Sequence, residues 1–490
     1  MQCSAALTID PGNERPTVGV IIQVMSPTTA DKVRIVTLGC AKNEVDSEEI
    51  AGVLQAAGYA VDGGAKKTAL TIINTCGFLE SAKDESVKAI KEAVREKRAG
   101  RTGRVIVAGC LAHRLGPELK RLAPGADLYI GVGQMARFAE IALQVQQQRD
   151  EAAVDVTAPH HRWADVPTRA RAGRPWSAYL KISEGCNHRC TFCTIPSFRG
   201  AHQSKPIERV VAEANHLARQ GTREINLIAQ DVTQYGFDLY KAFTLPRLLR
   251  ELNVVEGIDW IRLLYFYPNL LTDEVIEAMA TLNKVVKYID IPLQHTHPDT
   301  LRRMHRPWDG DRYLRLFEQV RAAMPDVAIR TTFIVGFPGE TDAEFQHLLD
   351  FTRDARLDRV GAVTFSKEPG THAHDLEGQV APRIKQERYD KFMRLQQRIS
   401  LEKNEAWVGR ELDVLVEDAR DGWLVGRSFR DAPEIDGLVF VQGEAKPGDL
   451  VTARVNGAEH YDLSAQAERV PVAAGKKLTT LRMAGPSRPL

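Results

Sequence analysis

Short apolar runs rich in β-branched residues alternate with helical stretches near the start of the chain. The runs are Val33–Leu38, Ala69–Asn74 and Arg104–Ala108, and a turn signal and a helical pattern follow each of them. This alternation predicts an open α/β domain with a parallel sheet, which we assign to residues 32–145. Residues 1–31 show no periodicity, so we interpret them as a flexible leader in which Cys3 is incidental.

The alternation resumes with longer repeats after residues 146–176, a basic stretch that we interpret as a linker without chemistry. Six further strand–helix units predict an open, partial (β/α)6 barrel over residues 177–405. The candidate strands are Tyr179–Ser183, Glu224–Ala229, Ile261–Phe266, Tyr288–Ile291, Ile329–Val335 and Val360–Phe365.

The pattern changes after a long predicted helix at Lys385–Asn404. Short β-rich runs separated by turns predict a small all-β barrel over residues 406–470, followed by a loose tail at 471–490. These runs are Glu411–Glu417, Gly422–Phe429, Gly437–Gln442 and Leu450–Arg454.

Composition sets broad limits on function. The chain has 490 residues, 43% of them hydrophobic, and a formal net charge of +1, so we expect two to four domains and no direct nucleic-acid reading. The longest apolar run near the start, Val18–Met25, is too short to cross a bilayer. We therefore expect no membrane association and a cytoplasmic location.

Three cysteines at C-x3-C-x2-C spacing, Cys186, Cys190 and Cys193, follow the first candidate strand of the partial barrel. Their thiolates can converge on one iron–sulfur cluster and leave one iron without a protein ligand. The spacing resembles the signature of the radical S-adenosylmethionine (SAM) superfamily. The alternatives are a chance cluster of cysteines and a zinc knuckle, but zinc requires four ligands, and His188 between the first two cysteines would strain the loop.

A second set of three cysteines lies in the first domain. Cys40, Cys76 and Cys110 each directly follow a candidate strand, and the carboxyl ends of parallel strands meet at one edge of a sheet. We therefore predict a second three-thiolate cluster site there. The alternative is that each cysteine fills a tight turn as a small residue.

The strand exits of the partial barrel supply further candidates, because chemistry in such barrels gathers at the carboxyl ends of the strands. We predict that SAM contacts come from Gln230, Asp231, Gln294, Gly336, Gly339 and Glu340. Thr341 and Glu344 also form a capping-box pattern, so the glycine-rich stretch could be a helix entry alone. His295 could be a base or a structural histidine, and Tyr265 and Tyr267 could pack or contact substrate.

Several stretches together resemble the radical SAM methylthiotransferase family, and within it the branch that modifies an aspartate of small-subunit ribosomal protein S-twelve. The resemblance covers Val33 to Leu463, with Ala41 in place of an expected proline. Its motifs are Leu38–Asn43, Val45–Ser47, Asn74–Phe78, Lys181–Cys186, Asp290–His295, Phe333–Thr341 and Asp431–Gly437.

The resemblance implies a C-terminal barrel of the TRAM type, two [4Fe-4S] clusters and SAM. The cluster on Cys186, Cys190 and Cys193 would cleave SAM to a radical that takes hydrogen from the β-carbon of the aspartate. The cluster on Cys40, Cys76 and Cys110 would deliver the methylthio group. A low-potential electron donor such as a flavodoxin is implied as a partner, and the sulfur source and oligomeric state stay open.

The charge of the C-terminal barrel helps to choose among related functions. Residues 410–463 contain twelve acidic and six basic residues, a net charge of −6 that favours a basic protein partner over a phosphate backbone. A tRNA adenosine methylthiotransferase is thus the less favoured alternative. A cluster that only relays electrons would need a fourth protein ligand, and a non-enzymatic cluster-binding module is the remaining alternative.

Overall fold

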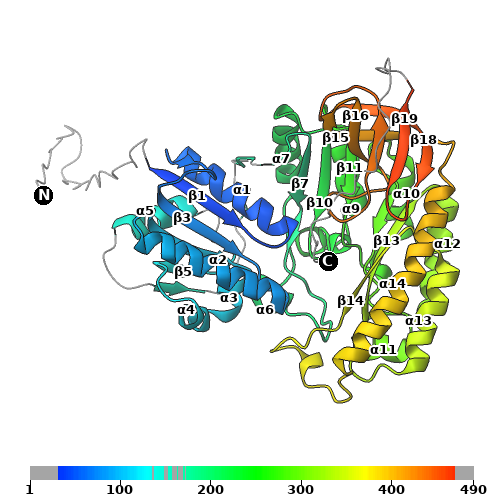
Figure 1. The fold of residues 1–490 in the computed structure, drawn as a ribbon, viewed down its shortest axis with the longest axis horizontal. Coiled ribbons are helices and arrows are strands. Elements are labelled where there is room, and N and C mark those ends of the chain that lie inside the picture. Colours follow the sequence, from blue (N-terminus) through cyan, green and yellow to red (C-terminus); the bar gives the residue numbers. More distant parts are fainter. Residues whose placement is uncertain are drawn as a thin grey trace, which may run out of the picture.

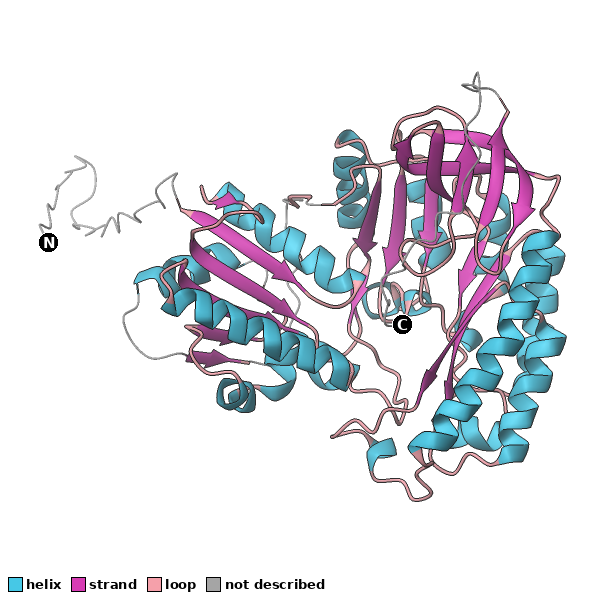
Figure 2. Ribbon diagram, viewed as in Figure 1, coloured by secondary structure: helices cyan, strands magenta, loops and turns pink. Residues whose placement is uncertain are grey.

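The computed structural model describes residues 31–134, 137–147, 153–156, 163, 169–171 and 173–468. The predicted leader, the tail and Cys3 lie almost wholly outside these residues. Three units follow one another along the described chain: an α/β sheet domain, a larger strand–helix domain and a C-terminal β-barrel (Figure 1). Figure 2 shows helices flanking the first sheet and lining the outside of the second unit.

The first unit is built on a parallel sheet of six strands in the order β2-β1-β3-β4-β5-β6. The strands are β1 (Lys32–Thr37), β2 (Ala60–Val61), β3 (Thr68–Thr75), β4 (Thr102–Gly109), β5 (Leu128–Ile130) and β6 (Ala153–Asp155). The helices are α1 (Ala41–Ala56), α2 (Glu80–Arg98), α3 (Cys110–Leu115), α4 (Pro117–Leu122) and α5 (Phe138–Gln147). The edge strand β6 lies within the range assigned to the linker.

The second unit has six parallel strands in two groups, β11-β10-β7 and β12-β13-β14. An isolated bridge between Ile261 and Val285 joins the groups. The strands are β7 (Ser177–Lys181), β10 (Glu224–Ile228), β11 (Trp260–Leu263), β12 (Tyr288–Asp290), β13 (Ala328–Val335) and β14 (Arg359–Thr364), with a small antiparallel pair β8 (Ser183–Glu184) and β9 (Gln203–Ser204).

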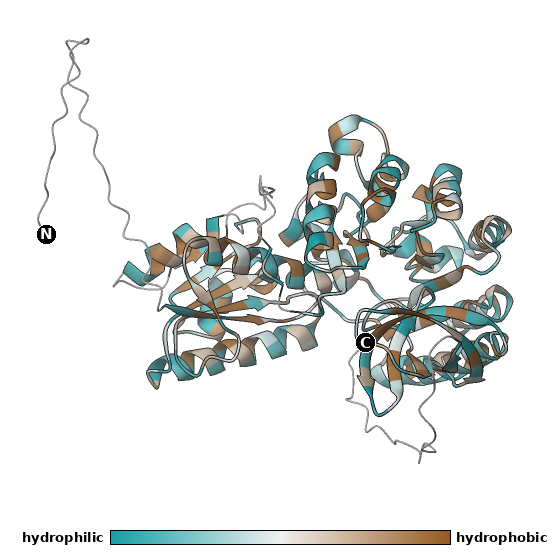
Figure 3. Cartoon of the chain, turned by 90° about the horizontal axis from the view of Figure 1, so that it is seen from above, coloured by the Kyte–Doolittle hydropathy of each residue, from teal (hydrophilic) through white to brown (hydrophobic). Residues whose placement is uncertain are grey.

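Helices on the outside of these strands bury apolar faces against the sheet, and Figure 3 shows brown and teal positions alternating along them. They are α7 (Ile207–Arg219), α9 (Leu245–Asn253), α10 (Asp273–Thr281), α11 (Pro298–Arg303), α12 (Gly310–Ala323), α13 (Asp342–Ala355) and α14 (Pro382–Glu405). Of two further short helices, α6 (Ile195–Arg199) packs against the first unit and α8 (Phe237–Tyr240) buries no residue. Short 3-10 turns lie at Val232–Gln234, Pro268–Leu270 and His372–His374. The predicted partial barrel is thereby confirmed.

The third unit is a closed barrel with the strand order β15-β16-β17-β19-β18. Its strands are β15 (Glu411–Arg420), β16 (Trp423–Ser428), β17 (Val439–Gln442), β18 (Leu450–Ala458) and β19 (Leu463–Ala467). Alternate residues along the strands fill its apolar core. The predicted all-β barrel is confirmed, and β19 is an additional strand that the sequence pattern did not reveal.

Buried ion pairs join the three units. Arg169, 4% exposed, pairs with Glu48 of α1 and with Glu213 of α7, at 2.7 Å in the second case. Arg427 of β16 pairs with Glu224 of β10 at 2.6 Å. Within the predicted linker, Arg169 is therefore not solvated, because its guanidinium is a buried link between the first two units. No helix in the described part of the chain has the length and apolar character that a membrane span requires.

Candidate functional site

The loop carrying Cys186, Cys190 and Cys193 leaves the barrel just after β8 and ends at α6. Gly185 has φ +74°, and a Cβ there would lie 2.1 Å from the carbonyl oxygen of Ala201, so the tight entry to the loop requires glycine. The Cys186 amide donates to Gly200 O at 3.0 Å and the Cys193 amide to Cys190 O at 3.1 Å. These bonds fold the loop back on itself and leave all three cysteines half-buried.

His188, inside this loop, is held by neighbours from the barrel. Its Nε2 lies 2.7 Å from Asp231 Oδ2, and its ring stacks on Tyr267 with centroids 3.5 Å apart. The imidazole therefore has a structural partner on its edge and on its face. This arrangement argues against His188 as the fourth ligand of a zinc knuckle.

Arg306 completes the same stack from its other side. Its guanidinium lies 4.1 Å from the centroid of the Tyr267 ring, and its Nη2 donates to Pro292 O. Its Nη1 is 3.9 Å from Cys190 Sγ. Arg306 Nε is buried and has no hydrogen-bond partner among the described residues, so a donor beside the cysteine loop is available to a ligand.

The second trio lies where the topology predicted, at the carboxyl ends of neighbouring strands. Cys40 is the N-cap of α1, Cys76 directly follows β3, and Cys110 is the first residue of α3 after β4. Gly39 has φ +93°, and a Cβ there would lie 2.7 Å from Cys76 Sγ. The segment that carries Cys40 therefore passes directly against Cys76.

Two asparagines fix this sheet edge. Asn43 Nδ2 donates to Leu38 O at 2.8 Å and to Thr75 O at 3.0 Å. Asn74 Nδ2 donates to Asn43 O at 2.8 Å. The turns after β1 and β3 are thus cross-linked by side-chain amides, which holds the two cysteine-bearing turns in register.

The sulfur spacing of both trios argues against a single zinc ion. Zn–S bonds of about 2.3 Å would bring ligand sulfurs within about 4.6 Å of one another. Within the described residues, neither trio brings its three sulfurs within 4.8 Å of one another. At least one pair of sulfurs in each trio is therefore farther apart than a single zinc ion requires.

Burial affects the protonation of these thiols. It raises the pKa of Cys186 to about 11 and the pKa values of Cys193 and Cys110 to about 12. Without a metal these thiols stay protonated at neutral pH. A bound iron–sulfur group would supply the positive charge that stabilises the thiolates.

A buried network of charged side chains lies between the trios. Arg199, at the end of α6, lies 3.2 Å from Cys110 Sγ through Nη2 and 2.6 Å from Glu184 Oε1 through Nη1. Glu184 is two residues before Cys186. Lys181 pairs with the same Glu184 at 2.9 Å and with Asp46 of α1 at 2.5 Å. The two cysteine sites are therefore neighbours across the boundary of the first two units.

The SAM-contact candidates at the exit of β10 have different surroundings. Gln230 Nε2 donates to Glu184 Oε2 at 3.1 Å, while its buried Oε1 has no hydrogen-bond partner in the described chain. Asp231 instead uses its carboxylate on His188, Thr233 and Gln234. Gln230 thus offers a free acceptor, whereas Asp231 orients the cysteine loop through His188.

The candidates near β13 form one organised turn. Glu340, 5% exposed, accepts the amides of Gly336 at 2.8 Å and Phe337 at 3.2 Å and pairs with Arg388 at 2.8 Å. Gly336 and Gly339 have φ values of +73° and +74°. Thr341 and Glu344 form the reciprocal capping box of α13, so this stretch is at least a helix entry. Contact of these residues with SAM stays a prediction.

Gln294 and His295 follow β12. Gln294 has φ +75°, and its amide donates to Thr332 O at 2.9 Å. His295 is fully buried, and its Nδ1 accepts the amide of His297 at 3.0 Å. Burial lowers the pKa of His295 well below its usual value. A neutral imidazole is compatible with a structural histidine and with a base, so both interpretations of His295 stay predictions.

Tyr265 also lies between the units. Lys42 Nζ is 3.7 Å from the centroid of its ring, and burial lowers the pKa of this lysine. The contact joins the helix after Cys40 to the exit of β11. It shows Tyr265 packing at the domain boundary.

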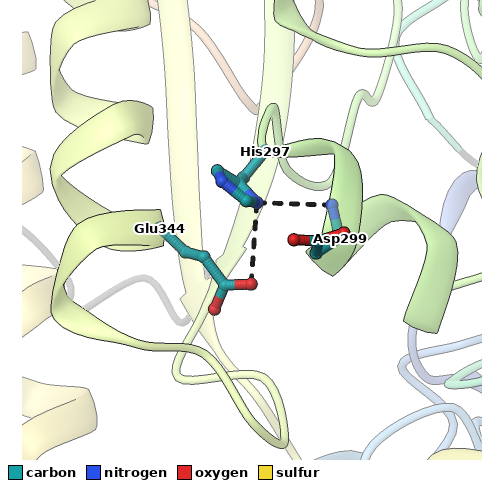
Figure 4. Close-up of side chains that lie close together, drawn as sticks. All are labelled: His297, Asp299 and Glu344. Atoms are coloured by element: carbon teal, nitrogen blue, oxygen red, sulfur yellow. Dashed lines mark hydrogen bonds and ion pairs between the residues drawn. The ribbon is translucent and has the colours of Figure 1, made fainter.

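Three other potential metal ligands, His297, Asp299 and Glu344, lie close together (Figure 4). His297 Nδ1 accepts the Asp299 amide at 3.3 Å, and Glu344 accepts Arg303 at 3.0 Å and the Thr341 amide at 2.7 Å. These bonds cap α11 and α13. The group is explained by helix capping, so we assign it no metal.

Arg199 and Arg306 were not among the predicted site residues. Arg199 lies six positions after Cys193, but its partner Cys110 is 89 residues away in the sequence. Arg306 reaches Cys190 from 116 residues away. The proximity of Arg199 to the cysteine loop was a weak signal, and no local pattern marked Arg306.

Comparison with known families matches each unit of the chain. Residues 180–352 match the Radical SAM superfamily, residues 32–131 match the Uncharacterized protein family UPF0004, and residues 408–467 match the TRAM domain. The first match supplies the cofactors of the site, a [4Fe-4S] cluster and SAM. It also confirms the resemblance drawn from the cysteine loop.

Solved structures show the fold. Radical S-adenosylmethionine methyltransferase TsrM from Kitasatospora setae, with cobalamin and a [4Fe-4S] cluster bound, has a TM-score of 0.55 and 16% identity. The alignment covers 70% of this chain and 76% of that chain.

Curated relatives align with most of this chain. "Ribosomal protein uS12 methylthiotransferase RimO" of Moorella thermoacetica is 48% identical over 86% of this chain and 96% of its own length. The proteins of the same name from Symbiobacterium thermophilum and Roseiflexus castenholzii are 44% and 45% identical, covering 89% and 88% of this chain and 91% and 95% of their own lengths. The chain therefore belongs to the radical SAM methylthiotransferases of the RimO family, and it is a transferase of methylthio groups.

Proposed function

We propose that this protein methylthiolates the β-carbon of an aspartate in ribosomal protein uS12, in the cytoplasm, with one cysteine trio for each of two [4Fe-4S] clusters. The observation that carries the proposal is the placement of the two trios on either side of one buried network, with Arg199 in contact with Cys110 and with Glu184. The relatives named for uS12 support this substrate over tRNA.

Cys186, Cys190 and Cys193 would hold the cluster that binds SAM. The spacing of their sulfurs, wider than a zinc site needs, supports this role. The cysteine loop is braced by the stack of His188, Tyr267 and Arg306. The brace would keep the three thiolates in place while one iron remains open to SAM.

Two unpaired polar atoms beside this loop support SAM binding. The buried Gln230 Oε1 can accept and the buried Arg306 Nε can donate a hydrogen bond, and both lack a partner among the described residues. An arginine beside the loop suits a carboxylate such as that of SAM. We propose direct contact for Gln230 and Arg306 and keep Asp231, Gln294, Gly336, Gly339 and Glu340 as candidates around them.

Cys40, Cys76 and Cys110 would hold the second cluster. The bound clusters and SAM supply an electron, a radical that takes hydrogen from the substrate, and the methylthio group. The protein positions these groups: Asn43 and Asn74 fix the sheet edge, and Lys181 and Arg199 fix the edge against the cysteine loop. A low-potential donor such as a flavodoxin would supply the electron.

The C-terminal barrel would bind the basic substrate protein. Arg427 and Arg430 are 1% exposed, and Asp431 and Asp436 also have buried side chains. Setting these four and Glu417, whose side chain is 7% exposed, aside leaves nine acidic and four basic residues in 410–463, a net charge of −5 on the other residues. Such a surface attracts a basic protein and repels a phosphate backbone.

Mass spectrometry of uS12 tests the proposal. In a strain that lacks this protein, uS12 should lose the mass of its methylthio group, and the intact gene should restore it. In the purified enzyme, Cys186→Ala should abolish both SAM cleavage and product, whereas Cys76→Ala should abolish product and retain SAM cleavage. A normal methylthio mass in the deletion strain would exclude uS12 as the substrate.

A further inference from the structure

We propose that Arg199 is a positioning residue that fixes the Cys110 thiolate and raises the reduction potential of the second cluster. The proposal rests on the assignment of that cluster to Cys40, Cys76 and Cys110. Arg199 comes from the second unit, on the helix that directly follows the SAM-type cysteine loop. It is 2% exposed, so its charge acts with little screening by water.

The contacts of Arg199 use both sides of the guanidinium. Nε and Nη2 lie 3.3 and 3.2 Å from Cys110 Sγ, which makes a forked pair of N–H···S contacts. Nη2 also lies 2.8 Å from Asn43 Oδ1 and 3.0 Å from Asp46 Oδ2, and Nη1 lies 2.6 Å from Glu184 Oε1. One planar group therefore holds a thiolate ligand of one site and an anchor of the other.

The charge balance shows what these contacts do. The carboxylates of Asp46 and Glu184 face two cations, Arg199 and Lys181, which offset them, and Lys181 also lies 3.8 Å from Glu49. The N–H groups of Arg199 therefore face the Cys110 thiolate, and they also face the negative charge that a cluster there gains on reduction. Hydrogen bonds to cluster sulfurs favour the reduced state and raise its potential.

The competing explanation is that Arg199 only holds the two units together and does not affect the cluster. Lys181 offers the control, because it pairs with the same Asp46 and Glu184 but with no cysteine sulfur among its described contacts. Lys181→Gln removes a cation from the same network. Arg199→Gln removes a cation and both N–H···S contacts.

The experiment uses the full-length chain with Cys186, Cys190 and Cys193 changed to Ala, so that iron reports on the second site. This parent should bind about four irons. Its failure to bind iron would refute the assignment of the second cluster, independently of Arg199. Anaerobic redox titration, followed by electron paramagnetic resonance, then gives the midpoint potential of the cluster in each variant.

We expect Arg199→Gln to move the midpoint to a more negative potential, Arg199→Lys to move it less, and Lys181→Gln to leave it near the parent value. Loss of iron from Arg199→Gln, with iron kept in Arg199→Lys and Lys181→Gln, would also support the role of Arg199 in holding Cys110. An unshifted, fully loaded Arg199→Gln would overturn the proposal. Equal shifts or equal iron loss in Arg199→Gln and Lys181→Gln would do the same.

Discussion

At the scale of single residues, Gly39 sets how closely the turn of Cys40 approaches Cys76. A Cβ at Gly39 would lie 2.6 Å from Cys76 Cβ, so we expect Gly39→Ala to displace a ligand of the second site. Purified protein should fall from about eight irons to about four, with SAM cleavage retained, as iron analysis and a cleavage assay would show.

Gly221 is the matched control for Gly39. Its φ is +91°, close to the +93° of Gly39, but a Cβ there would meet nothing within 4 Å. Both alanine variants carry the same backbone cost, about 1–2 kcal/mol. Full iron content in Gly39→Ala, or equal iron loss in both variants, would refute the steric explanation.

Arg306 permits a second prediction at the same scale. Arg306→Gln removes the guanidinium above Tyr267, and a charge-assisted hydrogen bond contributes about 1.5–3 kcal/mol. We therefore expect SAM to bind roughly tenfold to a hundredfold more weakly, by equilibrium dialysis, with the iron content unchanged. Arg189→Gln, an exposed change in the same loop, should keep the affinity of the parent; equal affinities in all three proteins would exclude a SAM contact.

The site residues that could be predicted share one property. Their position directly after a strand was sufficient to place them in the fold. Cys40, Cys76 and Cys110 each follow a strand of one parallel sheet, and topology alone brings such positions to one edge. The contacts of Arg199 and Arg306 depend on how separate elements pack against each other, and the sequence pattern does not predict that packing. Their contacts therefore became visible only in the folded chain.

At the scale of elements, strand length decided which strands of the first unit the sequence pattern could reveal. The eight-residue strands β3 and β4 are buried apolar runs, and both were predicted. The three-residue strands β5 and β6 are too short for periodicity to appear. β19 alternates small residues, with the pattern LSAQA, and its apolar signal is correspondingly weak.

The segment between β16 and β17 docks the C-terminal barrel onto the second unit. Asp431, 1% exposed, accepts Arg359 Nη2 at 2.7 Å and Ser428 Oγ at 2.7 Å. Asp431→Ala would leave the Arg359 charge buried, at a cost of about 3–5 kcal/mol. We expect a lower melting temperature and faster proteolytic release of the barrel.

Glu444→Ala is the control for this docking prediction, since Glu444 is an exposed acidic residue of the same barrel. It should change neither the melting temperature nor the proteolysis pattern. The docking role of Asp431 would be disproved if Asp431→Ala behaved like Glu444→Ala in both measurements.

At the scale of the whole molecule, the three units meet around an acidic pocket of about 400 Å³. Its lining includes Glu44 and Glu48 from α1 and Glu417 and Glu434 from the C-terminal barrel. Burial, and to a smaller extent the nearby Glu48 and Glu434, raise the pKa of Glu44 to about 7. The folded state therefore disfavours a charge on Glu44 at neutral pH.

The sign of the pH effect follows from this shift. The pKa of Glu44 is about 7 in the folded protein, whereas its ordinary value is 4.5. The free energy of unfolding therefore falls as the pH rises from 4.5 to about 7, because the unfolded chain loses this proton at a lower pH than the folded protein does. Glu44→Gln is neutral at every pH. With screening allowed for, the variant should be more stable than the parent by about 1–2 kcal/mol at pH 8 and nearly equal to it at pH 5.

Differential scanning calorimetry at pH 5 and pH 8 would measure this difference as a gain in melting temperature confined to the higher pH. Glu92→Gln, an exposed change on α2 of the same unit, should show no gain at either pH. An equal gain for Glu44→Gln at both values would mean that the amide improves packing, because packing does not titrate. A gain that grows with pH would instead show that the folded protein disfavours a charge on Glu44, first through burial and then through the nearby carboxylates of Glu48 and Glu434.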